Sequence, residues 1–372
     1  MSKISISKCN SYKIENVQRA VDNCLAELGG ISTFIKSEDS VLIKPNILLA
    51  KKPEEAVTTH PAVIEAITKT VQEIGAVPLV GDSPGGLVGN VGKHWEITGI
   101  EEVCNRLGVE IINFEASGVY ERTINGFNYH IAKPVLDADF IINVPKIKTH
   151  GLTTFTCAIK NMYGSIPGLI KVDYHKKAPK PPEFSSLLVD IFALTKPNLN
   201  IVDGIIGMDG SGPSSGNQKE IGMILASTDG VALDSFICNI LGKDPIKVPT
   251  NKIAHERGLG ESNINNIDVL GYKPEVMKDF KWPSSIASSN LLPGFMFGGL
   301  MKLYWSRPAI NPDRCTNCRS CVNSCPVEAL TAGVDIPEFN YPKCITCLCC
   351  IEMCPEKAVY QDKSLLAKLI TR

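Results

Sequence analysis

The stretches CTNCRSCVNSCP (315–326) and CITCLCCIEMCP (344–355) decide the fold of the C-terminal part of this chain. Both follow the spacing C-x2-C-x2-C-x3-C-P, and each cysteine of that spacing in the second stretch lies 29 residues after its counterpart in the first. The repeat continues beyond the cysteines, because PVEAL (326–330) is matched by PEKAV (355–359). We therefore expect two similar halves related by a pseudo-twofold axis.

This spacing is the one with which bacterial ferredoxins hold two [4Fe-4S] clusters, the fourth cysteine of each run binding the other cluster. Close spacing lets a loop wrap three corners of a cubane, and the proline after each run breaks the chain so that the fourth thiolate crosses over. Zinc is the alternative, but zinc sites usually take two cysteine pairs separated by a long loop. The expected ligands are Cys315, Cys318, Cys321 and Cys354 for cluster one, and Cys344, Cys347, Cys350 and Cys325 for cluster two.

The ninth cysteine of this region, Cys349, has no place in the spacing. We interpret it as a non-ligand neighbour of the second cluster, and a swap of register with Cys350 is the alternative. The chain has 14 cysteines in total. The remaining five are scattered and are expected to be packing residues: Cys9, Cys24, Cys104, Cys157 and Cys238.

Charge and the chain start restrict the class of protein. The 372 residues include 38 Lys plus Arg and 39 Asp plus Glu, a net charge of -1, which argues against nucleic-acid binding. The start, MSKISISKCN, lacks the apolar stretch and cleavage site of a secretory signal, so we expect a cytoplasmic protein, in which clustered cysteines usually bind metal. The uncharged stretch 282–301 contains Pro283 and Pro293, so we expect a linker and no membrane span.

The region before the cysteine-rich tail alternates between strand and helix patterns. Segments with helical periodicity, such as 14–28, 61–74 and 231–241, lie between short apolar runs, and Thr59 is the expected cap of the second helix. This pattern predicts an α/β fold, a mostly parallel sheet with helices on both faces. The expected strands are 41–43, 77–80, 140–143, 199–202 and 223–226.

The chain is long enough for two or three domains at roughly 100–200 residues each. We expect the α/β domain to cover residues 1–280 and a linker to cover 281–307. A small α+β domain with two clusters, similar to ferredoxins, should cover 308–360, and 361–372 should form a C-terminal tail.

Polar or glycine-rich segments follow all five expected strands. In open α/β sheets ligands bind in the crevice outside the carboxyl ends of the strands, so we expect these segments to form one site, with Lys44, Asn46 and Asp82 contacting substrate. The alternative is ordinary loop composition, which explains the glycines, prolines and aspartates but not the lysines. The segments are 44–46, 81–86, 145–151, 203–213 and 229–230.

A lysine-rich segment, residues 143–180, has seven lysines against one acid. Such a local surplus of positive charge favours an anionic small molecule or cofactor. Its two histidines suit acid-base or metal-ligand roles near neutral pH, although a single histidine is more often structural. The candidate catalytic residues here are Lys146, Lys148, His150 and His175, and the candidate substrate-binding residues are Lys160, Asn161 and Lys171.

Residues 203–234 have the opposite bias, five acids against one lysine. Their carboxylates suit pairing with the lysines, binding of a divalent cation or general-base catalysis, and turn formation is the alternative. We take Asp203 as a catalytic candidate and Asp229 and Asp234 as substrate-binding candidates. The glycine-rich strings match neither GK[ST] nor G-x-G-x-x-G, so we predict no nucleotide site. The sequence does not decide whether the body also binds a flavin or a divalent metal.

Several short motifs together resemble a known family. They are KPN (44–46), GDSPG (81–85), VPKIKTHG (144–151), IKNMYG (159–164), DGIIGMDGSGP (203–213) and DGVALD (229–234), followed by the two-cluster tail. The combination resembles the iron-sulfur members of the family called domain of unknown function 362, over nearly the whole chain. The resemblance implies two [4Fe-4S] clusters and leaves the reaction of the body unassigned.

The sequence thus predicts an iron-sulfur redox protein. Its clusters would transfer electrons between a soluble redox partner and the anion-binding crevice, as in a ferredoxin-linked oxidoreductase. Fusion of the cluster domain to the body favours this hypothesis, because it makes electron delivery intramolecular. The alternative is a module for ligand binding, partner binding or assembly, in which the clusters are structural or sensory.

Overall fold

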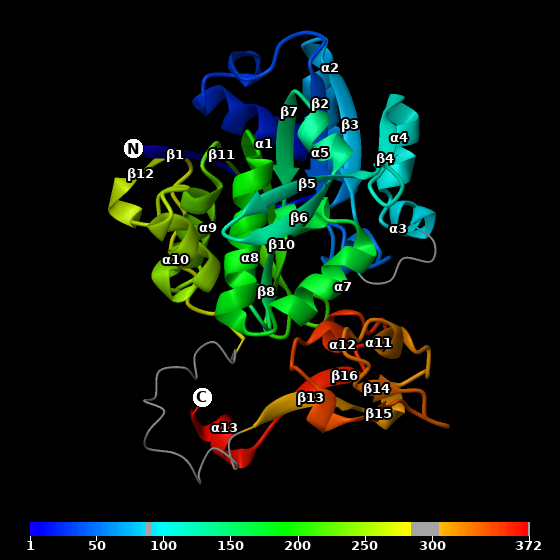
Figure 1. The fold of residues 1–372 in the computed structure, drawn as a ribbon. Coiled ribbons are helices and arrows are strands. Elements are labelled where there is room, and N and C mark those ends of the chain that lie inside the picture. Colours follow the sequence, from blue (N-terminus) through cyan, green and yellow to red (C-terminus); the bar gives the residue numbers. More distant parts are fainter. Residues whose placement is uncertain (86–90, 284–304, 371–372) are drawn as a thin grey trace.

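A ten-stranded sheet forms the centre of the α/β body (Figure 1). The structure is a computed structural model that describes residues 1–85, 91–283 and 305–370. Eight strands lie in the order β12-β1-β11-β10-β7-β2-β3-β4, while β8 pairs with β10 and β9 pairs with β8. These strands are β1 (Ser2–Lys8), β2 (Ser40–Pro45), β3 (Val77–Asp82), β4 (Glu110–Asn113), β7 (Phe140–Val144), β8 (Lys146–His150), β9 (Thr154–Thr156), β10 (Leu199–Asp209), β11 (Asn217–Ser227) and β12 (Ile267–Gly271).

The direction of the strands confirms the predicted mostly parallel α/β fold. Strands β10, β7, β2, β3 and β4 pair in parallel, and all five expected strands are present. Two strands run in the reverse direction: β9 is antiparallel to β8, and β11 is antiparallel to both β10 and β1. The carboxyl end of β11 therefore lies at the opposite edge of the sheet from the carboxyl ends of β2, β3 and β7.

Two of the expected loops are strands instead. Residues 146–150 form β8, and β10 continues through residue 209 because it pairs with β11 along most of its length. The glycines that suggested a loop allow close backbone approach. A Cβ atom at Gly204 would lie 2.8 Å from the carbonyl oxygen of Met223, and one at Gly207 would lie 2.9 Å from that of Ile147.

Helices cover both faces of the sheet, because the central strands are buried on both sides. In β2, Val41 and Ile43 pack with α1, α2 and α4, whereas Leu42 packs in a second core with α8 and the hairpin β5 (Val119–Ile124) and β6 (Phe127–Ala132). The helices of the body are α1 (Ile14–Glu27), α2 (Pro61–Glu73), α3 (Gly92–Ile97), α4 (Ile100–Leu107), α5 (Lys133–Asp137), α6 (Ala158–Asn161), α7 (Gly168–Lys177), α8 (Pro181–Thr195), α9 (Gly230–Ile240) and α10 (Pro249–Glu256).

The three expected helices correspond to α1, α2 and α9, but the predicted cap of α2 is wrong. The side chain of His60 accepts the hydrogen bond from the amide of Ala62. The hydroxyl of Thr59 instead donates to the carbonyl oxygen of Val144, 2.7 Å away. Thr59 therefore ties the start of α2 to β7.

The C-terminal domain is built from two similar halves (Figure 1). Strand β13 (Ser306–Ile310) pairs with β16 (Val359–Lys363), and β14 (Leu330–Thr331) pairs with β15 (Glu338–Phe339). Its helices are α11 (Ser320–Asn323), α12 (Cys349–Glu352) and α13 (Leu365–Ile370). Left-handed backbone conformations recur with the sequence repeat, at Asn317, Arg319 and Glu328 and again at Thr346, Leu348 and Lys357.

The pairing of β13 with β16 extends this domain slightly beyond the expected range 308–360, on both sides. Most of the expected linker, residues 284–304, lies outside the described residues, as does Gly86 at the end of the expected segment 81–86. No helix in the described part of the chain combines the length and apolar character needed to cross a membrane.

Candidate functional site

A cavity of about 90 Å³ lies between the α/β body and the C-terminal domain. The body supplies the loops after β2 and β3 and residues of β9, α6 and α7, and the C-terminal domain supplies residues in and beside α11 and α12. We call this space the seam cavity. Its polar and sulfur-containing lining comprises Asn46, Asp82, Ser83, Thr156, Lys160, Asn161, Tyr163, Lys171, His175, Ser324, Cys349, Glu352 and Met353.

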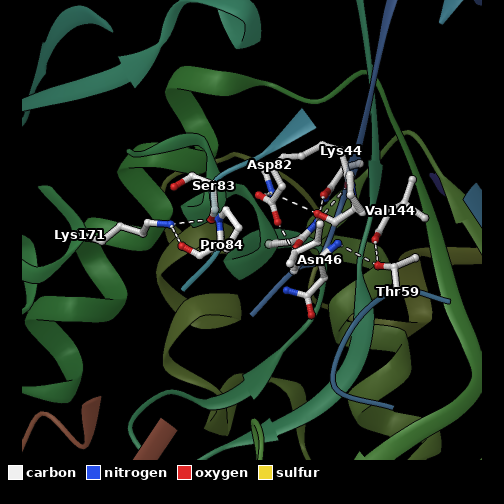
Figure 2. A network of polar contacts seen from close by, with 12 residues as sticks. Lys44, Asn46, Thr59, Asp82, Ser83, Pro84, Val144 and Lys171 are labelled. Carbon is white, nitrogen blue, oxygen red and sulfur yellow. Dashed lines mark hydrogen bonds and ion pairs between the residues drawn. The ribbon is translucent and has the colours of Figure 1, made fainter. Parts of the chain in front are cut away.

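The first pair of predicted residues, Lys44 and Asp82, forms a buried ion pair beside this cavity (Figure 2). Strands β2 and β3 are parallel neighbours, so the residues at their carboxyl ends meet. The Lys44 Nζ lies 2.7 Å from Asp82 Oδ1, and Asp82 Oδ2 accepts a hydrogen bond from the amide of Ile47. Burial lowers the pKa of Lys44 and raises that of Asp82, and the charge of each partner opposes this. The pair holds the two loops together.

Asn161, which also lines the seam cavity, has a side-chain oxygen without a hydrogen bond. Its Nδ2 lies 2.7 Å from Asn143 Oδ1 and 3.3 Å from the carbonyl oxygens of Lys44 and Pro45. Because the amide nitrogen faces these acceptors, the Oδ1 atom is left buried without a hydrogen bond.

Four further buried polar atoms of the lining have no hydrogen-bond partner in the described part of the chain: Asn46 Oδ1, Thr156 Oγ1, His175 Nδ1 and Glu352 Oε1. The backbone of Asn46 is fixed, since its amide donates to Thr59 Oγ1 (Figure 2). Buried polar groups in folded proteins are nearly always paired with protein, water or ligand. Five such atoms around one cavity therefore mark it as a place for polar molecules.

Two lysines line the cavity without a carboxylate partner among the described residues. The Nζ of Lys171 donates to the carbonyl oxygens of Ser83 and Pro84, at 2.6 and 2.7 Å (Figure 2), and burial lowers its pKa to about 8. The Nζ of Lys160 makes no hydrogen bond to the described residues and lies 5.9 Å from the centre of the Tyr163 ring. Burial lowers the pKa of Lys160, and the nearby Glu352 opposes this.

The two candidate histidines differ in position. His175 lines the cavity and stacks on Phe184 with the ring centres 4.1 Å apart. Burial lowers its pKa to about 4, so it is neutral near pH 7. His150 is fully buried, and its Nδ1 accepts hydrogen bonds from the amides of Leu152 and Thr153. The proton of neutral His150 therefore resides on Nε2.

Glu352 connects this histidine to the C-terminal domain, and the sequence analysis did not select it. Its Oε1 lies 3.0 Å from His150 Nε2, without good hydrogen-bond geometry, and its carbonyl oxygen accepts from Ser214 Oγ. Burial opposes ionisation of Glu352, but the neighbouring His150 and Lys160 outweigh this and lower its pKa. Burial also lowers the pKa of His150, so we describe the contact as a neutral imidazole facing a carboxylate.

A signal for Glu352 is present in the repeat. The first half has Asn323 at the equivalent position, and Ser320 stands where the second half has Cys349. Glu352 and Cys349 are two of the positions at which the halves differ, and both line the seam cavity.

Lys146, Asp203 and Lys148 do not line the seam cavity. Lys146 Nζ lies 2.7 Å from Asp203 Oδ2 and from the hydroxyl of Tyr12, which donates to Asp203 Oδ1. Lys148 is fully buried and its Nζ donates to the carbonyl oxygen of Val57, and burial lowers its pKa well below the usual range. Both lysines connect β8 to neighbouring segments.

The sequence analysis expected Asp229 and Asp234 near the carboxyl ends of the parallel strands, but β11, which precedes them, does not end there. That strand runs in the reverse direction, so Asp229 follows it at the opposite edge, where it caps α9 by accepting from the amides of Val231 and Ala232. The carboxylate of Asp234 accepts from the amides of Ala158 and Ile159 at the start of α6. Among the described residues, no group of three or more His, Cys, Asp or Glu side chains is placed to hold a metal ion.

Four of the predicted cluster ligands lie around one small cavity. They are Cys315, Cys318, Cys321 and, from the other half, Cys354. Burial raises the pKa of Cys350, and the nearby thiols of Cys347, Cys344, Cys321 and Cys325 raise it further. All eight thiols are free of disulfides.

Backbone amides also point at these sulfurs. The amides of Ala329 and Ala358, one in each half, donate to Cys325 Sγ and Cys354 Sγ at 3.1 and 3.2 Å. Hydrogen bonds to thiolate sulfur are one means by which proteins adjust the potential of iron-sulfur clusters. Cysteine thiols are the ligands that iron-sulfur clusters take, so the donor type fits such clusters.

Comparisons with known proteins match the α/β body and the C-terminal domain to different family models. Residues 41–239 match the model of the family described as domain of unknown function 362, and residues 307–355 match the 4Fe-4S dicluster domain. A thylakoid-associated protein of the cyanobacterium Synechocystis is 34% identical over 281 residues, 75% of this chain and 87% of that protein. Among solved structures, the lactate racemase apoprotein of Thermoanaerobacterium thermosaccharolyticum has a TM-score of 0.41 and 14% identity, over 63% of this chain and 55% of that chain.

Proposed function

The chain belongs to the family described as domain of unknown function 362 and ends in a 4Fe-4S dicluster domain, and from this premise we propose that it is a ferredoxin-linked redox protein. In this proposal the seam cavity binds a small anion. A soluble redox partner exchanges electrons with the C-terminal domain, and the bound anion is the compound whose redox state changes.

One observation carries the proposal: the seam cavity is built by both domains, and polar atoms without hydrogen bonds lie in its lining. Five buried polar atoms of the lining lack hydrogen bonds, and two lysines lack a carboxylate partner among the described residues. Unpaired buried polar groups cost roughly 1–3 kcal/mol each. A ligand that pairs with them removes this cost.

The position of the cluster ligands supports a link between the cavity and the C-terminal domain. One [4Fe-4S] cluster would be held by Cys315, Cys318, Cys321 and Cys354. The other would be held by Cys344, Cys347, Cys350 and Cys325. When bound, such clusters supply single electrons. Cys349 lines the seam cavity and is adjacent in sequence to the predicted ligand Cys350.

Residues of the chain then have distinct tasks. Lys160 and Lys171 attract the anion, and the buried ion pair of Lys44 and Asp82 keeps the loops of the cavity in place. Neutral His175 offers Nδ1 to a hydrogen-bond donor on the ligand, or donates from it in the other tautomer.

The test uses the anaerobically reconstituted full chain. We expect about eight irons per chain and a reducible cluster signal. A screen of small carboxylates, phosphates and sulfonates should find compounds that speed the reoxidation of the reduced protein. Lys160→Gln should abolish this effect while keeping the iron, whereas Lys176→Gln, an exposed lysine of α7, should not.

A protein that binds such compounds without any change in reoxidation rate would favour the alternative, a binding or assembly module with structural or sensory clusters. One contact is compatible with this alternative. The Glu352 carboxylate and carbonyl oxygen both face the body, next to His150 and Ser214, so the C-terminal domain is fixed in place next to the cavity.

A further inference from the structure

The chemistry of the seam cavity restricts its ligand beyond a simple anion. The Lys44–Asp82 ion pair is neutral overall and leaves no charge for a ligand. Of the remaining charged side chains in the lining, Lys160 and Lys171 are positive and Glu352 is negative. With the lysines protonated, the cavity carries a surplus of one positive charge. A ligand with a single negative charge neutralises it.

The unpaired atoms of the lining add a second requirement. Asn46 Oδ1 and Asn161 Oδ1 are carbonyl oxygens, which only accept hydrogen bonds. The orientation of the Asn161 amide is fixed by the acceptors around its nitrogen, so its oxygen is correctly assigned. A bare carboxylate has no donor and leaves the Asn161 oxygen unpaired. The ligand must therefore carry N–H or O–H groups in addition to its charge.

The size of the cavity sets the scale of the ligand. Its volume is about 90 Å³. At ~10–15 Å³ for each water-sized group, this is room for roughly six to nine heavy atoms. A nucleotide or a flavin is far larger.

We propose that the seam cavity recognises a small carboxylate that carries a neighbouring hydrogen-bond donor, such as a primary amide. The carboxylate contacts Lys160, and the donor contacts the free oxygens of Asn46 and Asn161. This inference rests on the proposed function, because it specifies the ligand class of the same site.

Two probes separate the charge from the donor. Oxamate and pyruvate have the same charge and the same number of heavy atoms, and they differ only by an NH2 group in place of a methyl group. Binding of each to the oxidised, cluster-loaded full chain is measured by anaerobic calorimetry. Oxamate should bind at least about fivefold more tightly, since pyruvate leaves a buried acceptor unpaired.

Variants assign the two effects to named residues. Lys160→Gln should weaken both probes roughly tenfold or more and leave their ratio unchanged, while the exposed control Lys176→Gln should change neither. Asn46→Leu should reduce the preference for oxamate. Asn46→Asp keeps an acceptor oxygen but adds a negative charge, so it should weaken both probes and retain the preference. Iron content and the cluster absorption spectrum verify that each variant is folded and loaded.

The outcomes distinguish this inference from the proposed function. Equal affinity for the two probes, both dependent on Lys160, would overturn the donor requirement and leave the anion site intact. Binding that ignores Lys160, or no binding of either probe up to roughly 10 mM, would overturn the anion site itself.

Discussion

Removing one member of the Lys44–Asp82 ion pair should destabilise the body far more than removing one member of an exposed ion pair. The two side chains are 0% and 2% exposed, and their charged atoms are 2.7 Å apart. Loss of one partner leaves an uncompensated charge in the interior, which costs about 3–5 kcal/mol. Lys44→Met and Asp82→Asn should each lower the free energy of unfolding by about this amount.

The double variant provides the internal comparison. With both residues replaced, no buried charge remains, so the total loss should be smaller than the sum of the two single losses. We expect a coupling free energy of at least about 2 kcal/mol. The exposed ion pair of Lys177 with Asp173 is a matched control, and Lys177→Met should cost less than about 1 kcal/mol.

Urea unfolding of the anaerobic, cluster-loaded chain measures these values. Far-ultraviolet circular dichroism reports the body, and cluster absorption is followed separately because two domains need not unfold together. Hydrogen exchange adds a local measurement, since the amide of Ile47 donates to Asp82 Oδ2 and should exchange faster in Asp82→Asn. Single variants as mild as Lys177→Met, or a strictly additive double variant, would refute the reasoning.

Three further predictions concern the same region. Gly164→Ala should destabilise the body and slow ligand binding, because the new Cβ would lie 2.0 Å from Asp82 Oδ1; an unchanged melting temperature would contradict this. Cys349→Ser should retain about eight irons per chain, whereas Cys350→Ser should lose iron and alter the electron paramagnetic resonance spectrum of one cluster; equal losses would mean that Cys349 is a ligand. Affinity for a monoanion should fall as the pH rises through about 8, because Lys171 loses its proton there. Lys171→Gln should weaken binding and remove this pH dependence. Calorimetry at pH 7 and 9 measures both effects.

The pH dependence of stability has the opposite sign. The pKa of Lys171 is lowered in the folded protein, so the unfolded chain binds more protons above about pH 8. The unfavourable burial of its charge is therefore present below about pH 8 and is relieved as the pH rises toward the ordinary lysine range. Binding and stability thus respond to the same proton in different directions.

The central strands and helices could be predicted because their sequence signals are local. A strand such as β2 is apolar on both faces, and that pattern persists whatever it pairs with. The reversed direction of β11 has no local signal. It is set by pairing with β10, and it places Asp229 away from the site that its position after a strand suggested.

Part of the candidate site could also be predicted. Asn46 and Asp82, which follow parallel strands, line one cavity together with four residues of the lysine-rich segment, Lys160, Asn161, Lys171 and His175. Lys146 and Lys148 belong to β8 instead, where pairing with β10 and β9 buries them. A lysine in a loop and a lysine in a buried strand look the same in one sequence.

The sequence by itself determined the alternation of strands and helices and the repeated spacing of eight cysteines, because periodicity and spacing are properties of the chain. Only the tertiary structure decided which half of the cysteine repeat faces the body, and that Glu352 and Cys349 complete a cavity with residues about 200 to 300 positions away. The physical reason is that burial and unpaired hydrogen-bonding groups exist only once distant segments pack together.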